Sequence, residues 1–353
     1  MAKKILLICG SINQTRQMHR ISEELPEHEC YFAPYFADGF LEVARKLGLL
    51  EFTILGNKLG GRCLEYLHEH ELAVDFHGRS HAYDLVLTCS DLIVPRIVRH
   101  TPTILVQEGM TDPENLLYSI ARRIRLLPRW IASTSTTGLS HAYAYFCVAS
   151  EGYRDLFIRK GIAPNKLVVT GMPNFDNCRV YENNSFPYHN FVLVCTSDTR
   201  ETFKLENRKQ FILNAVRIAH GRQLIFKLHP NENARRATRE INRYAPGAMV
   251  FASGCAEEMV ANCDVLITRF STLAYVGLAL EKETYSDFDL KDLRRLLPLQ
   301  HRCGARNIAA MCRSLLEEAD AAQREYAERV THDDHARELP SDCIPEAATG
   351  GGV

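Results

Sequence analysis

The sequence predicts an α/β protein with two domains, each built around a parallel sheet. Short apolar runs alternate with helical patterns along most of the chain, which is typical of parallel strands joined by crossover helices. This alternation occurs twice, and a polar, turn-rich stretch at residues 181–190 separates the two series. The 353 residues suffice for two cores, because a single domain usually contains about 100–200 residues.

The first series contains strand patterns at residues 4–9, 52–55, 85–89, 103–106, 145–149 and 167–170. The second contains strand patterns at residues 191–195, 223–228, 249–251, 265–268 and 283–286, with helical patterns at 208–220, 234–244, 255–263 and 273–280. Two such series predict Rossmann-like domains, residues 1–180 and 181–330, which face each other across a cleft between strand ends. A long helical pattern at 307–330 should return across both domains, and the polar residues 331–353 are predicted to form a flexible tail.

Composition and charge narrow the range of partners. The chain has 42 Lys and Arg against 43 Asp and Glu, so a general attraction to nucleic acid is not expected. No apolar stretch approaches the roughly 20 residues that cross a bilayer, and the first apolar run lacks a signal-peptide cleavage region. The twelve cysteines include no CxxC pair, which favours reduced cytoplasmic thiols over disulfides or a metal site.

One candidate site follows the strand pattern at residues 223–228, where the chain continues as His229-Pro230-Asn231. Pro230 cannot continue the strand ladder and restricts His229 to an extended conformation. The imidazole should therefore lie at the strand end, where it could donate a hydrogen bond to a phosphate oxygen. A loop histidine without a function is the alternative.

A second candidate follows the strand pattern at residues 265–268, where Arg269-Phe270-Ser271-Thr272 precedes a helix. Ser271 or Thr272 suits a helix N-cap, and the exposed N–H groups there attract anions. Capping alone would explain either residue. The occurrence of both motifs at strand ends favours a ligand site.

Residues 226–230 and 264–280 resemble the His-Pro and Ser-Ser or Ser-Thr motifs of two-Rossmann-domain (GT-B) glycosyltransferases, including bacterial sialyl- and polysaccharide transferases. UDP-N-acetylglucosamine 2-epimerases share this architecture. Residues 145–152 and 167–176 look like the end of the N-terminal domain in these families, so that the resemblance covers about residues 1–325 in organisation. It implies transfer of a sugar from a nucleotide-activated donor to a carbohydrate or glycolipid acceptor during surface polysaccharide or glycolipid assembly.

The resemblance also assigns roles to residues. The C-terminal domain would hold the nucleotide sugar, and the N-terminal domain would hold the acceptor. The residues expected to bind the nucleotide sugar are His229, Pro230, Asn231, Arg269, Ser271 and Thr272. Two departures are visible: Val276 stands where many relatives have a ribose-binding glutamate, and residues 196–201 lack the catalytic histidine of the epimerases. Ribose recognition should therefore differ, and epimerase chemistry is disfavoured.

The third candidate is Gln107-Glu108-Gly109, which follows the strand pattern at residues 103–106. It resembles the acidic-acidic-Gly motif that supplies the general base in inverting sialyltransferases, with Gln in place of the first acid. Glu108 is therefore the expected base, which would deprotonate the acceptor hydroxyl as this attacks the anomeric carbon. Asp112 and Glu114 are further candidates, and solvated loop acids without a function are the alternative.

The loop after the first strand, with Gly10, Ser11 and Asn13, is neither GxGxxG nor a Walker motif. In this architecture it usually faces the transferred group or the acceptor, although an ordinary strand-to-helix turn would look the same. No DxD-like acidic pair stands at a strand end. We therefore expect metal-independent chemistry without a cofactor, in which helix dipoles and His229 replace an ion.

Three alternatives stay open: a 2-epimerase, a glycerol- or ribitol-phosphate transferase, and a non-catalytic nucleotide-sugar-binding protein. The segment from Leu116 to Ile131 bears on where the protein acts in the cell, because it has an apolar face opposite Arg122, Arg125 and Arg129. Basic amphipathic helices bind anionic membranes, although a helix packed on its own core gives the same pattern. A cytoplasmic location is expected, with contact at the inner face of the membrane as the further alternative.

Overall fold

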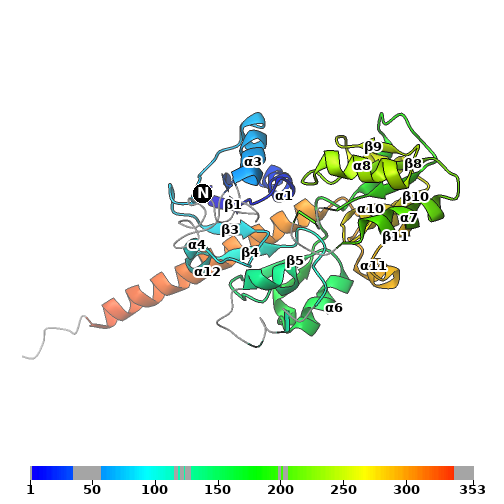
Figure 1. Ribbon diagram of the computed structural model, residues 1–353. Helices are drawn as coiled ribbons and strands as arrows, with labels where there is room; N and C mark the ends of the chain where they lie inside the picture. Colours follow the sequence, from blue (N-terminus) through cyan, green and yellow to red (C-terminus); the bar gives the residue numbers. More distant parts are fainter. Residues whose placement is uncertain are drawn as a thin grey trace, which may run out of the picture. The chain divides into compact units, whose positions relative to one another are not determined.

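The computed structural model describes residues 2–34, 57–114, 118, 119, 123, 129–197, 200, 201 and 206–337. The chain forms two compact units, residues 1–310 and 311–353. The first unit contains two separate parallel sheets with helices between their strands (Figure 1). The domain boundary predicted near residue 180 falls in the segment that joins the two sheets and stays a prediction.

The first sheet has six parallel strands in the order β2-β1-β3-β4-β5-β6. Their bounds are β1 (Lys4–Ile8), β2 (Glu29–Ala33), β3 (Leu85–Thr88), β4 (Thr103–Val106), β5 (Tyr145–Val148) and β6 (Leu167–Val169). The α-helices of this half are α1 (Ile12–Glu23), α3 (Asn57–Glu69), α4 (Arg96–His100) and α6 (Glu151–Lys160). β3 and β4 are buried along their whole length, and each is apolar except for one threonine at its end, as is usual in parallel sheets. The strand predicted at residues 52–55 lies outside the described residues.

The second sheet has five parallel strands in the order β11-β10-β7-β8-β9. Their bounds are β7 (Val192–Cys195), β8 (Leu224–Lys227), β9 (Met249–Phe251), β10 (Val265–Ile267) and β11 (Glu283–Tyr285). The helices are α7 (Arg208–Ala219), α8 (Ala234–Tyr244), α9 (Ala256–Asn262), α10 (Leu273–Ala279) and α11 (Leu290–Leu296). All five predicted strands and four predicted helices of this half are present, with ends that differ by a few residues.

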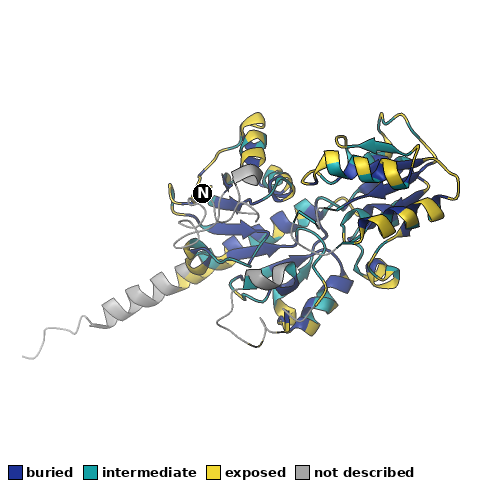
Figure 2. Cartoon of the chain, in the orientation of Figure 1, coloured by how far each residue is buried: buried dark blue, intermediate teal, exposed yellow. Residues whose placement is uncertain are grey.

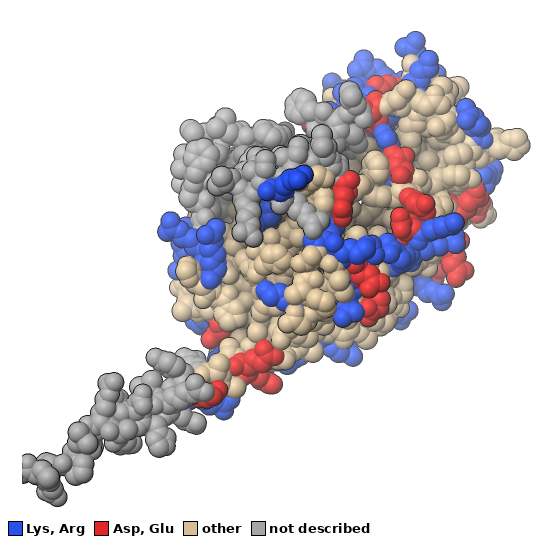
Figure 3. Space-filling view, turned by 90° about the horizontal axis from the view of Figure 1, so that it is seen from below, with Lys and Arg blue, Asp and Glu red and all other residues tan. Residues whose placement is uncertain are grey.

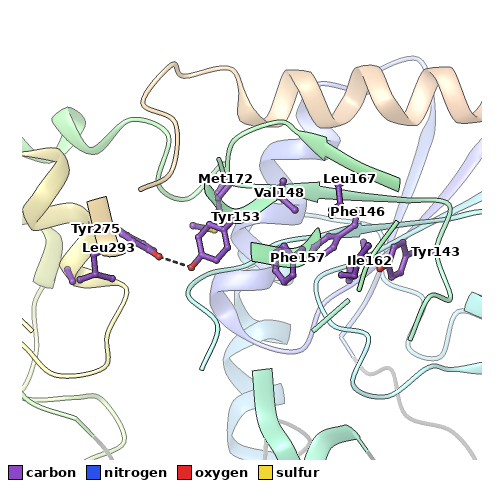
Figure 4. Close-up of a cluster of buried hydrophobic side chains, with 13 residues drawn as sticks. Tyr143, Phe146, Val148, Tyr153, Phe157, Ile162, Leu167, Met172, Tyr275 and Leu293 are labelled. Atoms are coloured by element: carbon purple, nitrogen blue, oxygen red, sulfur yellow. Dashed lines mark hydrogen bonds between the residues drawn. The ribbon is translucent and has the colours of Figure 1, made fainter. Parts of the chain in front are cut away.

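Buried segments occur in both halves (Figure 2), and one apolar cluster contains residues of the first sheet together with residues of α10 and α11. Tyr153 and Phe157 of α6 lie in the same apolar cluster as Tyr275 of α10 and Leu293 of α11. The hydroxyl groups of Tyr153 and Tyr275 form a buried hydrogen bond of 2.6 Å, and the two side chains point toward each other (Figure 4). This cluster therefore joins helices of both sheets in one core.

Two further contacts join α6 to the end of α11. A Cβ on Gly152 would lie 2.0 Å from the carbonyl oxygen of Arg295, so the helices approach closely only because residue 152 is a glycine. The Ser150 hydroxyl caps α6 and donates a hydrogen bond of 3.2 Å to the Leu296 carbonyl. Small residues at the start of α6 thus permit the contact.

The last described helix, α12 (Gly304–Arg337), extends further than predicted. The helical pattern predicted an end at Val330, because the following residues are polar. That end was wrong, because the helix continues to Arg337 and no Pro or Gly interrupts residues 331–337. The rest of the predicted tail, residues 338–353, lies outside the described residues. No described helix is both long and apolar enough to cross a membrane.

Charged side chains of both signs are interspersed on the face drawn in Figure 3. This agrees with the near balance of 42 basic and 43 acidic residues.

Candidate functional site

Glu108 follows β4 and is positioned by the residue before it. The Gln107 side chain is buried, and its Oε1 accepts a hydrogen bond of 2.9 Å from the Ala149 N–H at the end of β5. Its Nε2 donates to the Gly109 carbonyl at 2.9 Å. Because both ends of the carboxamide are bonded to backbone, the chain on either side of Glu108 is held at the carboxyl edge of the sheet.

The Glu108 carboxylate is held by two side chains of the loop and helix that follow β1. Ser11 Oγ donates to Glu108 Oε1 at 2.9 Å, and Gln14 Nε2 donates to Oε2 at 2.6 Å. Gln14 is itself fixed, since its Oε1 accepts a hydrogen bond of 2.7 Å from the Gly10 N–H. The predicted loop residues Gly10 and Ser11 therefore belong to the surroundings of Glu108.

The protonation of Glu108 reflects opposing effects. Burial raises the pKa of its carboxyl above the usual value, because the charged form loses hydration. The hydrogen bonds from Gln14 and Ser11 act in the opposite direction, because they stabilise the carboxylate. A carboxylate of this kind can accept a proton more readily than one in open solvent.

The loop after β4 contacts the Ser-Thr loop of the other sheet. A Cβ on Gly109 would lie 3.1 Å from Cγ2 of Thr272, which is closer than most Cβ contacts. The absence of a side chain at Gly109 therefore lets the two loops approach. The structure thus brings together two segments that the sequence analysis selected separately.

The other predicted acids lie in different surroundings. Asp112 is bonded to Thr134, whose hydroxyl donates to Asp112 Oδ2 at 3.0 Å and accepts from the Asp112 N–H at 2.9 Å. Burial lowers the pKa of the Lys160 amino group, and the nearby Glu114 carboxylate partly opposes this effect. Asn13 is exposed, and its carbonyl accepts a hydrogen bond of 2.9 Å from Asn174 Nδ2. None of these contacts involves the Glu108 carboxylate.

His229 lies at the carboxyl end of β8 and is half-buried. Its N–H donates to Thr196 Oγ1 at 3.1 Å, and its Nδ1 accepts a hydrogen bond of 3.2 Å from the Asn231 N–H. An accepting Nδ1 places the proton of the neutral ring on Nε2. The imidazole therefore has a donor on the ring edge opposite Nδ1. The neighbouring Pro230 and Asn231 are exposed.

The Ser271 hydroxyl accepts a hydrogen bond of 3.3 Å from the Leu273 N–H at the start of α10. Thr272 occupies the N-cap position of α10 without a side-chain bond. Val276 is fully buried in a cluster with Leu266 and Val260, so its side chain cannot reach a bound nucleotide. A ribose site without a glutamate at this position stays a prediction.

Arg269, a predicted nucleotide-sugar ligand, is paired with carboxylates. Its Nε donates to Asp287 Oδ2 at 2.7 Å, and its Nη1 lies 3.2 Å from Glu206 Oε1. A role in donor binding stays a prediction. The observed contacts fix the loop after β10 to the loop after β11.

An ion-pair network at the carboxyl ends of β7 and β8 was not predicted. The buried Glu232 accepts a hydrogen bond of 2.5 Å from Arg208 Nη2 and one of 2.5 Å from the Thr196 hydroxyl. Glu206 lies 3.2 Å from Arg208 and 3.6 Å from Arg200. Thr196 also accepts the His229 N–H, so the network supports the His-Pro loop. The sequence feature that could have indicated this network is the acidic residue Glu232, directly after His229-Pro230-Asn231.

The predicted amphipathic segment is described only in part. Tyr118 is buried, and residues Arg129–Thr136 form a 3-10 helix, η1. Most of the segment from Leu116 to Ile131 lies outside the described residues. Membrane contact through it stays a prediction.

No family model matches this chain, and no curated protein matches its sequence. Solved structures do match. UDP-GlcNAc 2-epimerase from Neisseria meningitidis bound to UDP-GlcNAc is 12% identical, with a TM-score of 0.55 over 89% of this chain and 100% of that one. The Methanocaldococcus jannaschii UDP-GlcNAc 2-epimerase in complex with UDP-GlcNAc and UDP is 14% identical, with a TM-score of 0.53 over 88% and 99%.

A structure of the wall teichoic acid polymerase TagF with CDPG is 10% identical, with a TM-score of 0.51 over 90% of each chain. At such low identity these likenesses concern the fold. Together with two parallel sheets and their interleaved helices, they confirm the predicted fold class. The chain therefore has the two-Rossmann-domain architecture of the GT-B type.

Proposed function

We propose that this protein is a glycosyltransferase, which moves a sugar from a nucleotide-activated donor to an acceptor hydroxyl in surface polysaccharide or glycolipid assembly. The observation that carries the proposal is the contact between Gly109 and Thr272. It supports the proposal because Glu108, the residue before Gly109, would act as the base beside a Ser-Thr loop that would hold the nucleotide sugar. Sugar transfer requires a general base close to the donor site.

Glu108 would act as the general base. As the acceptor oxygen forms its bond to the anomeric carbon, the bond from that carbon to the donor phosphate breaks and the hydroxyl proton passes to Glu108. The raised pKa of Glu108 suits this task, because it improves the proton affinity of the carboxylate. Ser11 and Gln14 would keep both oxygens oriented. Direct attack of this kind inverts the anomeric configuration.

The donor would bind at the carboxyl edge of the second sheet. His229 would donate its Nε2 proton to a phosphate oxygen, since the Asn231 N–H bonds to Nδ1. Ser271, Thr272, Pro230, Asn231 and Arg269 would complete the donor site. We propose that the reaction needs no metal, with these hydrogen bonds stabilising the leaving phosphate. Location in the cytoplasm, at the inner face of the membrane, would suit this role.

Two other activities have some support from the comparisons. The titles of two similar structures print UDP-GlcNAc 2-epimerase, and that of TagF prints a wall teichoic acid polymerase. Thr196 stands at the end of β7, where epimerases would need their histidine, and it is bonded to Glu232. This disfavours epimerisation. Transfer of a glycerol-phosphate group would use the same donor motifs and a similar base.

The test is a panel of UDP-, CMP- and GDP-sugars and CDP-glycerol, with and without an acceptor, in the presence and absence of EDTA. Binding would be followed by thermal shift and turnover by release of the nucleotide. We expect acceptor-dependent turnover of one nucleotide sugar that survives EDTA. Acceptor-independent isomerisation would identify an epimerase, turnover of CDP-glycerol alone a phosphate transferase, and binding without turnover a non-catalytic protein. Activity that needs added magnesium would contradict the metal-independent mechanism.

A further inference from the structure

Phe270 is an exposed aromatic residue directly before the Ser-Thr loop of the candidate site. Its side chain is 53% exposed, and it directly precedes Ser271 and Thr272. A large apolar side chain that stays exposed forgoes part of the free energy of burial. A single exposed apolar residue is ordinary on a protein surface. Phe270 differs from such a residue because Phe288 packs against its ring and because it directly precedes the Ser-Thr loop.

Neighbouring residues pack against one side of the Phe270 ring. Phe288, which follows β11, packs edge-on against it with ring centroids 4.8 Å apart and an interplanar angle of 85°. The Ser286 hydroxyl donates to the Arg269 carbonyl at 3.0 Å and accepts from the Phe288 N–H at 3.2 Å. The Arg269–Asp287 ion pair joins the same two loops. The ring is therefore supported by its neighbours on one side and exposed on another.

The strand order separates Phe270 from the histidine motif. Along the edge β11-β10-β7-β8-β9, His229 follows β8, Ser271 follows β10, and Phe288 follows β11. Phe270 contacts Phe288, so its ring lies on the β11 side of Ser271, whereas His229 lies on the β8 side. Thr272, two residues after Phe270, contacts Gly109 beside Glu108. A phosphate held between His229 and Ser271 would therefore have Phe270 on the side away from His229.

We propose that Phe270 is a stacking platform for a sugar ring, which deepens and rests on the proposed glycosyltransferase function. The C–H face of a pyranose ring is apolar and packs on the face of an aromatic side chain, while the hydroxyl groups stay at the ring edge. The ring belongs to the transferred sugar or to the acceptor.

The experiment compares Phe270→Ala with the wild type, using the nucleotide sugar selected by the panel, its parent nucleoside diphosphate and the acceptor. Affinities for the first two come from titration calorimetry, and the KM for the acceptor comes from initial rates. If the transferred sugar stacks there, affinity for the nucleotide sugar falls about 10-fold while that for the nucleoside diphosphate is unchanged. If the acceptor stacks there, its KM rises about 10-fold and donor affinity is unchanged.

Phe270→Tyr, which keeps the ring, should retain wild-type values. Phe76→Ala is the matched control, because Phe76 is 49% exposed and lies in a loop of the first sheet. An equal loss of affinity for the nucleoside diphosphate would overturn the proposal and make Phe270 a base-binding residue. No change in either sugar affinity or acceptor KM would also overturn it. Wild-type protein that binds no nucleotide sugar would instead refute the glycosyltransferase function.

Discussion

Thr272 places its methyl carbon against the backbone of Gly109, so that the loop after β10 contacts the loop after β4. Each loop belongs to a different sheet, and each follows the carboxyl end of its strand. The contact sets the distance between the Glu108 carboxylate and the Ser-Thr loop. Relatively small changes at either residue should therefore affect catalysis more than stability.

Gly109→Ala should lower kcat by up to about 10-fold, because the new methyl group would meet Thr272 Cγ2 at 3.1 Å and shift one loop. Thr272→Ser removes that methyl carbon and keeps the hydroxyl. The double variant should therefore recover most of the rate, whereas each effect would simply add if the residues were independent. Steady-state kinetics and thermal unfolding of the three variants would check this.

Glu108→Gln should reduce kcat by about 10²-fold or more and leave donor affinity intact, because it removes the proton acceptor and keeps the shape. Asp112→Asn and Glu114→Gln are the controls, since their side chains lie near Thr134 and Lys160. These two should retain most of the activity. An active Glu108→Gln variant beside a dead Asp112→Asn variant would move the base later in the loop.

Gln14→Met should move the acid limb of the kcat–pH profile to higher pH. The carboxylate form of Glu108 is the active base, so activity falls as the pH drops through its pKa. Burial has already raised that pKa, and the Gln14 hydrogen bond opposes the rise. Loss of the Gln14 hydrogen bond should therefore raise the pKa of Glu108 further. Ser22→Ala, on the same helix, should not move the profile, and an unmoved profile for Gln14→Met would separate Gln14 from the base.

His229→Ala should weaken binding of the nucleotide sugar by about 10- to 150-fold, which corresponds to the roughly 1.5–3 kcal/mol of a hydrogen bond to a charged group. Calorimetry with the donor selected by the panel would measure this. His189→Ala is a suitable control, because His189 is exposed in the segment before β7. Equal donor affinity in His229→Ala and the wild type would remove His229 from the site.

Much of the fold was predictable because buried parallel strands are almost continuously apolar, as in β4 and β10. β2 was missed because it is an outer strand, and its sequence Glu-Cys-Tyr-Phe-Ala mixes charged and apolar residues. The Ser11–Glu108 hydrogen bond could not be predicted, since it depends on β1 and β4 both flanking β3. Strand order of this kind arises from the packing of the whole sheet.

Charge partners were harder to predict than motifs. Arg269 was expected to bind a phosphate, but its guanidinium lies beside Asp287 and Glu206, which are distant in the sequence. Gln107 was noted only as a substitute for an acid, whereas its carboxamide joins the ends of β4 and β5. Both cases depend on partners that only the tertiary structure brings near.

The cluster that contains Tyr153 and Tyr275 has a consequence for folding. One apolar cluster combines residues of the first sheet with α10 and α11, because α6 packs with these helices. Residues 1–310 should therefore lose structure in one cooperative transition in denaturant rather than in two. A half expressed alone would expose aromatic surface and aggregate. Chimeras that exchange one Rossmann domain must therefore retain matching surfaces on α6, α10 and α11.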